Sequence, residues 1–262
     1  MLDIDLREAH DARANDSAFG ALDVPQRRDL VRRPRDETLP FRVRVVDSEA
    51  DLLRVQALRQ LAYGRHLPQM AASFGLPDPI DRQPDVTIFY AEDKASGELV
   101  GTARVQSNRT RPLQIERSVA LPAERSEQLL SEITRLSVLP GYVHPVRLAL
   151  VKASHLYCIA MQIGGVLAGS RRTLLRSYQN LGFVDLFDDA RMVPLAHAGG
   201  LEHRILFRDT VTSEAASRER AHPDYHFVFR TYHPDIQIFD AVHSRALQGA
   251  ARAVDAPWSR AA

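Results

Sequence analysis

The stretch LLSEITRLSVLPG, residues 129–141, carries the strongest structural signal in this chain. Within it, residues 133–139 (ITRLSVL) alternate apolar and polar side chains as a half-buried strand does. The breakers Pro140 and Gly141 end the pattern, and residues 146–163 follow as a strongly apolar run that is typical of a buried helix. We therefore expect a central strand followed by a helix that packs on the sheet.

The residues upstream of this strand predict a first strand, a helix, a long loop and a hairpin. Ser48 offers the helix an N-cap, and Lys94 to Gly97 supply the hairpin turn. The loop is rich in proline, and loops of its length in compact domains are usually functional or disordered. In chain order the ranges are 41–45 for the strand, 52–62 for the apolar residues of the helix, 64–85 for the loop, and 86–91 and 99–105 for the hairpin strands.

The residues downstream predict a second helix and further short strands. Ser170 offers an N-cap to a helix over 171–181, and Gly182 is the residue expected just past its end. Strands are expected at 166–168, 183–187, 204–207 and 225–232. The whole order predicts an α/β (α+β) domain built on a mixed, mainly antiparallel central sheet flanked by helices.

Composition narrows the classes of function. The net charge of the 262-residue chain is +1, so charge gives no reason to expect a nucleic-acid partner. Cys158 is the only cysteine, which excludes a multi-cysteine metal site, and we expect it to fill the core. The histidines at 222, 226 and 233 match no standard zinc spacing, so no metal is expected.

Location and domain organisation also follow from composition. No apolar run reaches the roughly 18 residues of a membrane span, and residues 1–30 lack a secretory signal pattern. We therefore expect a cytoplasmic protein without an integral membrane segment. Residues 1–40 predict an Arg-rich N-terminal extension, 41–208 the main domain, and 209–262 a C-terminal extension with room for an added strand and helix.

Four stretches, in order, carry a resemblance to a known family. They are ALRQLAYGRHLPQM (57–70) with PDPID (77–81), ELVGTARVQ (98–106), LLSEITRLSVLPG (129–141) and RSYQNLGF (176–183). The set resembles GNAT-fold N-acyltransferases, and among them the N-acyl amino acid synthases and acyl-homoserine-lactone synthases. The resemblance covers about residues 41–208, and it implies an enzyme that transfers a fatty acyl group from a thioester to the amine of an amino acid or related small molecule.

The acyl donor is expected to be an acyl carrier protein, and no bound cofactor is expected. Coenzyme A users in the wider fold carry a Gly-rich turn whose N–H groups bind pyrophosphate, whereas residues 140–145 here read PGYVHP. Prolines remove such donors, which favours an acyl-phosphopantetheine arm. Acyl-CoA with another small amine acceptor stays an alternative, as does a non-catalytic acyl-ligand sensor or accessory protein.

The resemblance implies two catalytic residues. Glu132 would accept the amine proton, directly or through a water, and its alternative is a salt-bridged strand glutamate. Tyr178 would protonate the leaving thiolate, and its alternative is packing against Phe183. Backbone N–H groups of the central strand would stabilise the oxyanion.

Four further residues would bind substrates. Arg59 or Arg104 would bind a carboxylate of the amine substrate, and Asp81 would attract its ammonium group. Arg135, three residues after Glu132, points to the opposite face of a regular strand. It would order the 64–85 loop or meet the phosphopantetheine arm, and its alternative is an ion pair with Asp78 or Asp81.

Basic residues near two helix starts are candidates for docking an acidic carrier protein. Such faces attract a partner of opposite charge, although a solvated helix face is the common alternative. The candidates are Arg147, Lys152, Arg171 and Arg172.

Overall fold

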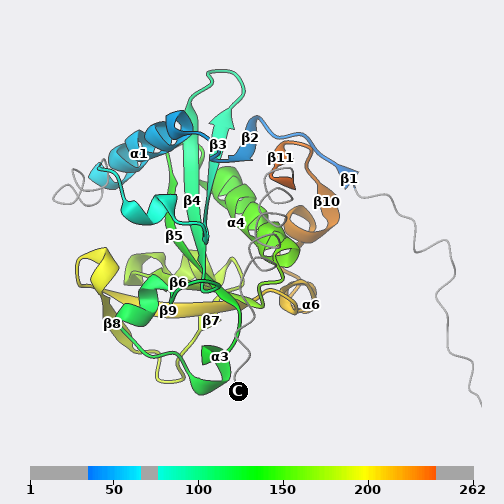
Figure 1. The fold of residues 1–262 in the computed structure, drawn as a ribbon. Helices are drawn as coiled ribbons and strands as arrows, with labels where there is room; N and C mark the ends of the chain where they lie inside the picture. The colour runs from blue at the N-terminus through cyan, green and yellow to red at the C-terminus, as the bar shows by residue number, and fades with distance from the viewer. Residues whose placement is uncertain (1–34, 66–75, 240–262) are drawn as a thin grey trace, which may run out of the picture. The chain divides into compact units, whose positions relative to one another are not determined.

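The computed structural model describes residues 35–65 and 76–239, and Figure 1 shows its helices and strands. The strands are β1 (Arg35–Asp36), β2 (Phe41–Val45), β3 (Val86–Asp93), β4 (Leu99–Ser107), β5 (Leu130–Val138), β6 (Gly165–Ser170), β7 (Val184–Asp185), β8 (Met192–Leu195), β9 (Leu201–Asp209), β10 (Thr231–Tyr232) and β11 (Ile236–Gln237). The helices are α1 (Glu49–Gly64), α3 (Ala123–Ser126), α4 (Val143–Ala160), α5 (Leu175–Gln179) and α6 (Ser213–Glu219).

Most of these strands form one sheet in the order β11-β2-β3-β4-β5-β6-β9-β7, with β8 pairing β9. Neighbours from β2 through β5 are antiparallel, β5 and β6 are parallel, and β6 and β9 are antiparallel again. The sheet is therefore mixed and mainly antiparallel, which confirms the predicted fold class.

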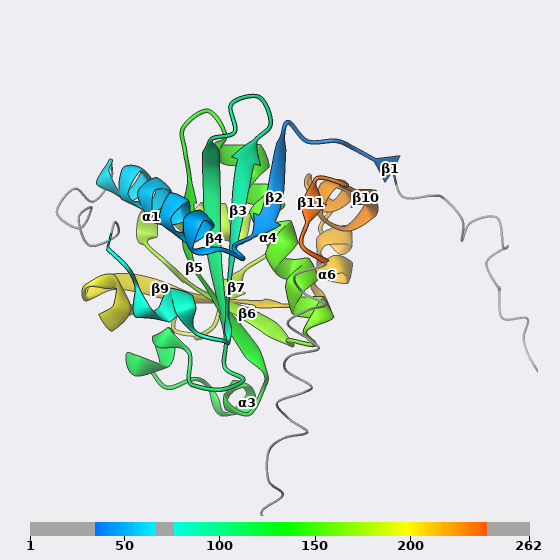
Figure 2. The ribbon, with the colours of Figure 1, turned by 45° about the horizontal axis from the view of Figure 1, so that its top comes forward.

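Helices α1 and α4 cover opposite faces of the sheet, as Figure 2 shows. Alternate side chains of β3 belong to two different cores: Phe89 packs in the core beside α4, and Ile88 packs in the core beneath α1. Gly101 of β4 lets α4 approach closely, because an added Cβ would lie 2.5 Å from Val146 Cγ1. The apolar helix predicted from the sequence is thus the packed layer behind the strand at 130–138.

The strands β5 and β6 are paired only at one end. Their register runs from Leu130–Gly165 to Ile133–Ala168 and then stops, although β5 continues to Val138 and β6 to Ser170. The backbone of both strands beyond this point has no partner in the other strand. The sheet is therefore splayed at its centre, and this gap places the site described below.

Two predicted elements are wrong in form. Residues 171–181 do not form one helix capped by Ser170, because Ser170 pairs with Arg204 inside the sheet; a 3-10 turn at Arg172–Leu174 and the short α5 follow it. Residues 225–232 are not a strand but a π-helical turn at His226–Arg230 followed by β10. Short apolar runs do not separate helix from strand by periodicity alone, which explains the second error.

The described part of the C-terminal region adds to the sheet. β11 pairs in parallel with β2, and α6 precedes it in the chain. The domain boundaries at 40 and 208 remain predictions. Of the Arg-rich extension predicted at 1–40, residues 1–34 lie outside the described residues, as do the helix and tail expected in the last twenty residues.

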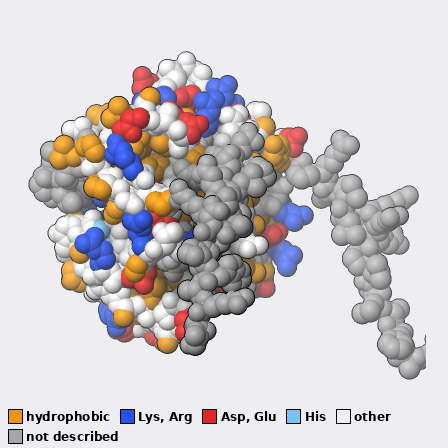
Figure 3. All heavy atoms as spheres, in the orientation of Figure 1, with side chains coloured by type: hydrophobic (Ala, Val, Ile, Leu, Met, Phe, Trp, Pro, Cys, Tyr) orange, Lys and Arg blue, Asp and Glu red, His pale blue; other side chains and the backbone are white. Residues whose placement is uncertain are grey.

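On the face shown in Figure 3, cationic and anionic side chains are interspersed.

Within the described residues, no helix is long and apolar enough to cross a membrane. The same residues contain no group of three or more His, Cys, Asp or Glu side chains placed to hold a metal ion.

Candidate active site

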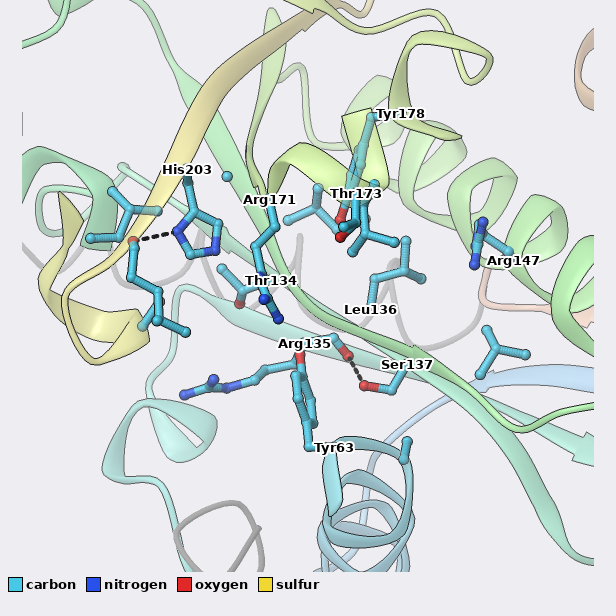
Figure 4. A pocket seen from close by; sticks show the side chains of 18 of the residues that line it. Tyr63, Thr134, Arg135, Leu136, Ser137, Arg147, Arg171, Thr173, Tyr178 and His203 are labelled. Atoms are coloured by element: carbon cyan, nitrogen blue, oxygen red, sulfur yellow. Dashed lines mark hydrogen bonds between the residues drawn. The ribbon is translucent and has the colours of Figure 1, made fainter. Parts of the chain in front are cut away.

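A cavity of about 800 Å³ lies at the gap between β5 and β6. Its wall includes the part of β5 beyond the paired end, Gly169 of β6, and side chains from α1, α4, α5 and β9. Figure 4 shows these side chains surrounding the space. Of the residues predicted as site members, those on the wall are Arg135, Arg147, Arg171 and Tyr178.

A bulge in β5 shapes the cavity wall. The register with β4 moves from Thr102–Ser137 to Arg104–Thr134, so one extra residue is accommodated in β5. Arg135 lies in this bulge with a φ of 56°, a left-handed conformation that is uncommon for a residue other than glycine. The strand is therefore not regular at this point, and the simple alternation that separates Arg135 from Glu132 does not apply.

Arg59, Arg104 and Asp81 are not on the cavity wall. Arg59 Nη1 lies 2.6 Å from Asp81 Oδ2, and Arg104 Nη1 lies 3.0 Å from Asp81 Oδ1. Arg104 Nη1 also lies 2.6 Å from Asp78 Oδ2. The two guanidinium groups are thus neutralised by aspartates of the same chain, so the predicted contacts with the substrate's carboxylate and ammonium groups are replaced by a buried ion-pair network.

This network holds the end of the proline-rich segment against the sheet. Asp78 caps the 3-10 turn Pro79–Arg82 by accepting a hydrogen bond from Ile80 N. Arg135 Nη2 lies 3.6 Å from Asp78 Oδ2, which is the ion pair that the sequence allowed as an alternative role. Asp78 and Asp81 therefore connect α1, β4 and β5 through their arginines.

Glu132 is fully buried behind the cavity. Its Oε2 accepts a hydrogen bond from Ile115 N at 3.0 Å. Burial raises the pKa of this carboxyl to about 7, although the N–H of Ile115 and the charge of Arg104 oppose the shift. Glu132 is not part of the cavity wall, so its carboxylate reaches the cavity only through a neighbour.

That neighbour is His197, which is not among the site residues predicted from the sequence. His197 Nε2 lies 3.3 Å from Glu132 Oε1, and the His197 side chain lines the cavity. Burial, together with the charges of Arg135 and Arg104, lowers the pKa of His197 to about 4, so the imidazole is neutral. It lies in the short turn Ala196–Ala198, where no sequence pattern points to it.

Tyr178 lies on α5 and lines the cavity. Its ring packs edge-to-face on Phe183, with ring centroids 5.5 Å apart, so the predicted packing contact is present together with exposure to the cavity. Burial raises the pKa of this phenol to about 12, which keeps it protonated and able to donate a proton or a hydrogen bond.

The four docking candidates are found in three different settings. Arg147 and Arg171 line the cavity, and Arg172 is exposed. Lys152 is buried, and its Nζ donates hydrogen bonds to Phe227 O at 2.8 Å and Thr231 O at 2.6 Å. A carrier protein cannot reach Lys152, so its predicted docking role is wrong: it connects α4 to the C-terminal region.

Cys158 fills the core, as predicted. It is buried among apolar residues of α4 and the sheet, and its Sγ lies 3.4 Å from Ser131 Oγ. Burial raises the pKa of the thiol to about 11, so the reactive thiolate is disfavoured.

Comparisons with known proteins bear on this architecture. No protein-family model and no curated protein sequence matches the chain. Among solved structures, FeeM, an N-acyl amino acid synthase from uncultured soil microbes, superposes with a TM-score of 0.53 at 14% identity, covering 67% of this chain and 93% of FeeM. BjaI, a CoA-dependent acyl-homoserine lactone synthase, has a TM-score of 0.49 at 18% identity, covering 79% of this chain and 99% of BjaI.

A structure from Desulfovibrio desulfuricans, described as an acetyltransferase of the GNAT family, has a TM-score of 0.46 at 15% identity, covering 65% of this chain and 99% of its own. At these identities, the likeness shows only that the fold is shared. The chain shares its fold with FeeM, which is one of the N-acyl amino acid synthases that its sequence resembles.

Proposed function

We propose that this protein is an N-acyltransferase that moves a fatty acyl group from a thioester to the amine of an amino acid or a related small molecule. The observation that carries the proposal is the cavity at the splayed strands β5 and β6, with His197 on one part of its wall, Glu132 behind His197, and Tyr178 on another part of the wall. The shared fold with FeeM, an N-acyl amino acid synthase, supports the same reaction class.

The chemistry requires that the amine lose protons, that the oxyanion be stabilised and that the thiolate leave. The amine nitrogen bonds to the thioester carbonyl carbon, and the C–S bond breaks. Of the two protons that the ammonium group loses, one passes through His197 to Glu132 and then to solvent. The other leaves with the thiol, because Tyr178 protonates the sulfur and regains a proton from the nitrogen.

Backbone N–H groups of β5 are the candidates for the oxyanion site. The bulge sets Arg135 and Leu136 opposite a single residue of β4, Ala103, and the register of β5 with β6 ends at Ile133, before the N–H of Leu136, which is the candidate donor. Peptide groups outside the ladder are fixed dipoles that can be aimed at a developing charge without reorganisation. The central strand would therefore stabilise the oxyanion through its backbone.

The donor in this proposal is an acyl carrier protein, which presents only its phosphopantetheine arm. The segment that leads into α4 supports this choice, since Pro140 in the preceding turn and Pro145 in the first turn of the helix have no N–H to offer a pyrophosphate group. Arg147 on the first turns of α4 and the exposed Arg172 are the remaining docking candidates, now that Lys152 is excluded. The proposed location is the cytoplasm, where the protein would meet such a carrier.

The test is thiol release by the purified protein from a matched acyl carrier protein thioester and acyl-CoA, each with the twenty common amino acids as acceptors. Release from the carrier thioester that depends on an amino acid is expected. Thiol release from acyl-CoA but not from the carrier thioester would show that the donor is acyl-CoA. Tight binding of the acyl thioester without thiol release would favour an acyl-ligand sensor.

Two variants tie the activity to the proposed site. Glu132→Gln should lower turnover by about two orders of magnitude, the loss typical of a general base, and Glu127→Gln on the exposed surface is its matched control. If Glu132 acts through His197, the double variant with His197→Gln should lose little more than either single variant, because the residues work as a unit. Additive losses would contradict the shared proton path.

A further inference from the structure

The cavity is cationic. Its wall carries four arginines, and none of its lining residues is an aspartate or glutamate within the part of the chain that the structure describes. A concave site with one sign of charge and low-dielectric walls concentrates ligands of the opposite sign. The arginines are Arg65, Arg135, Arg147 and Arg171.

These arginines differ in whether their charge is already matched. Arg135 is paired with Asp78, and the buried Arg59 and Arg104 are matched by Asp81. By contrast, the guanidinium of Arg171 forms no hydrogen bond or ion pair with any residue in the ranges 35–65 and 76–239; only its backbone carbonyl is bonded, by Ser170 Oγ and Leu174 N. It is therefore a guanidinium on the cavity wall that a ligand can bind.

Arg171 lies at the end of the cavity where the proton acceptor lies. Ser170, the last residue of β6, pairs with Arg204 of β9. Arg171 directly follows Ser170 and His203 directly precedes Arg204, and both side chains line the cavity. Burial lowers the pKa of His203, and the charge of Arg171 lowers it further; the charge of His203 in turn affects His197. Figure 4 shows Arg171 and His203 projecting into the same part of the cavity.

Arg147 serves the other end. Burial raises the pKa of Tyr178, and the charge of Arg147 opposes that shift, which places Arg147 near the residue assigned to the leaving thiolate. In Figure 4, Arg147 lies well apart from His203 and Arg171. Arg171 and Arg147 thus mark an acceptor end and a donor end of the cavity.

We propose that Arg171 is the residue that binds the carboxylate of the acceptor, so that the cavity selects amines that carry a carboxylate close to the nitrogen. The inference rests on the proposed function and names its acceptor site. A guanidinium offers a planar fork of donors that matches a carboxylate. In an α-amino acid one carbon separates the carboxylate from the amine, so binding at Arg171 holds the amine beside His203 and His197.

The test measures binding separately from turnover. The twenty common L-amino acids and their amides are each tested for equilibrium binding to the wild-type protein and to the variants Arg171→Gln, Arg171→Lys and Arg218→Gln. Arg218 is the matched control, because it is an exposed arginine that does not line the cavity. An amide keeps the size of the acid but removes its charge.

The wild-type protein should bind at least one acid more tightly than its amide. Arg171→Gln should weaken that acid by about 10- to 100-fold and leave the amide unchanged, the loss expected for a charge-assisted hydrogen bond. Arg171→Lys should recover part of the difference, and Arg218→Gln should match the wild type.

Equal binding of acid and amide, an unchanged acid affinity in Arg171→Gln, or no binding of any acid would each overturn the assignment. Failure of the proposed function looks different: selective, Arg171-dependent binding would persist while no acyl thioester released its thiol.

Discussion

Replacing Asp81 by asparagine should destabilise the protein strongly, because this carboxylate is the shared partner of two buried cations. The Asp81 side chain is 0% exposed, and its oxygens lie 2.6 Å from Arg59 Nη1 and 3.0 Å from Arg104 Nη1. Burial lowers the pKa of Arg59 more strongly than the charge of Asp81 raises it, so the site already tolerates a charge poorly.

The size of the loss in stability depends on the buried arginine charges that remain after Asp81 is replaced. Removing one partner of a buried ion pair costs about 3–5 kcal/mol, because the remaining charge is desolvated and unmatched. Asparagine keeps the shape and one acceptor oxygen, so the lower end, about 3 kcal/mol, is expected for Asp81→Asn.

Asp78→Asn is the matched comparison, since Asp78 also contacts Arg104 but its side chain is 24% exposed. Water can replace part of its interaction, and asparagine can still cap the turn at Pro79, so about 1 kcal/mol is expected.

Urea unfolding of the three proteins, followed by far-ultraviolet circular dichroism, gives the free energies of unfolding. Asp81→Asn should shift the midpoint well below that of Asp78→Asn, with an unchanged denaturant slope. Equal losses in the two variants would refute the reasoning that burial, rather than the number of ion pairs, sets the cost.

The titration of Glu132 and the contacts of Tyr178 and Lys152 lead to three more expected results. Because burial raises the pKa of Glu132 from 4.5 to about 7, the folded state binds a proton that the unfolded state releases between these values. Stability should fall by about 3 kcal/mol as the pH rises through that window, and Glu132→Gln should flatten the dependence measured by urea unfolding at each pH. Tyr178→Phe should lower the turnover number by at least about 10-fold with little change in KM if the phenol is the acid, whereas unchanged turnover would leave it a packing residue. Lys152→Met should lower the thermal midpoint, because the carbonyls of Phe227 and Thr231 lose their donor, yet leave the KM for a carrier thioester unchanged; a raised KM would restore the docking role.

Local patterns predicted the central elements well. The strand at 130–138, the helix at 143–160 and the hairpin of β3 and β4 lie close to their expected ranges. Their signals are strong because each element presents one face, or most of its surface, to a core, and burial imposes its period on the sequence. The Pro-rich segment also contains the short helical turn that was expected, at Pro79–Arg82.

The composition of the site was harder to predict. The sequence pointed to the residues of the ion-pair network, which include Asp78, Asp81, Arg104 and Arg135. Sequence spacing could not tell an arginine that binds a ligand from one that binds an aspartate of its own chain. That distinction depends on distances between segments that are remote along the chain.

Residue order and periodicity thus specify which segments become strands and helices, and which residue types are available for acyl transfer. Folding specifies which of those residues meet. The bulge at Arg135 interrupts the alternation of β5, and the pairing of β6 with β9 brings Arg171 and His203 to the wall of the same cavity. His197 reaches Glu132 from a turn with no periodic signal. The physical reason is that periodicity records only the burial of an element's own face, whereas charge matching, desolvation and cavity walls arise between elements.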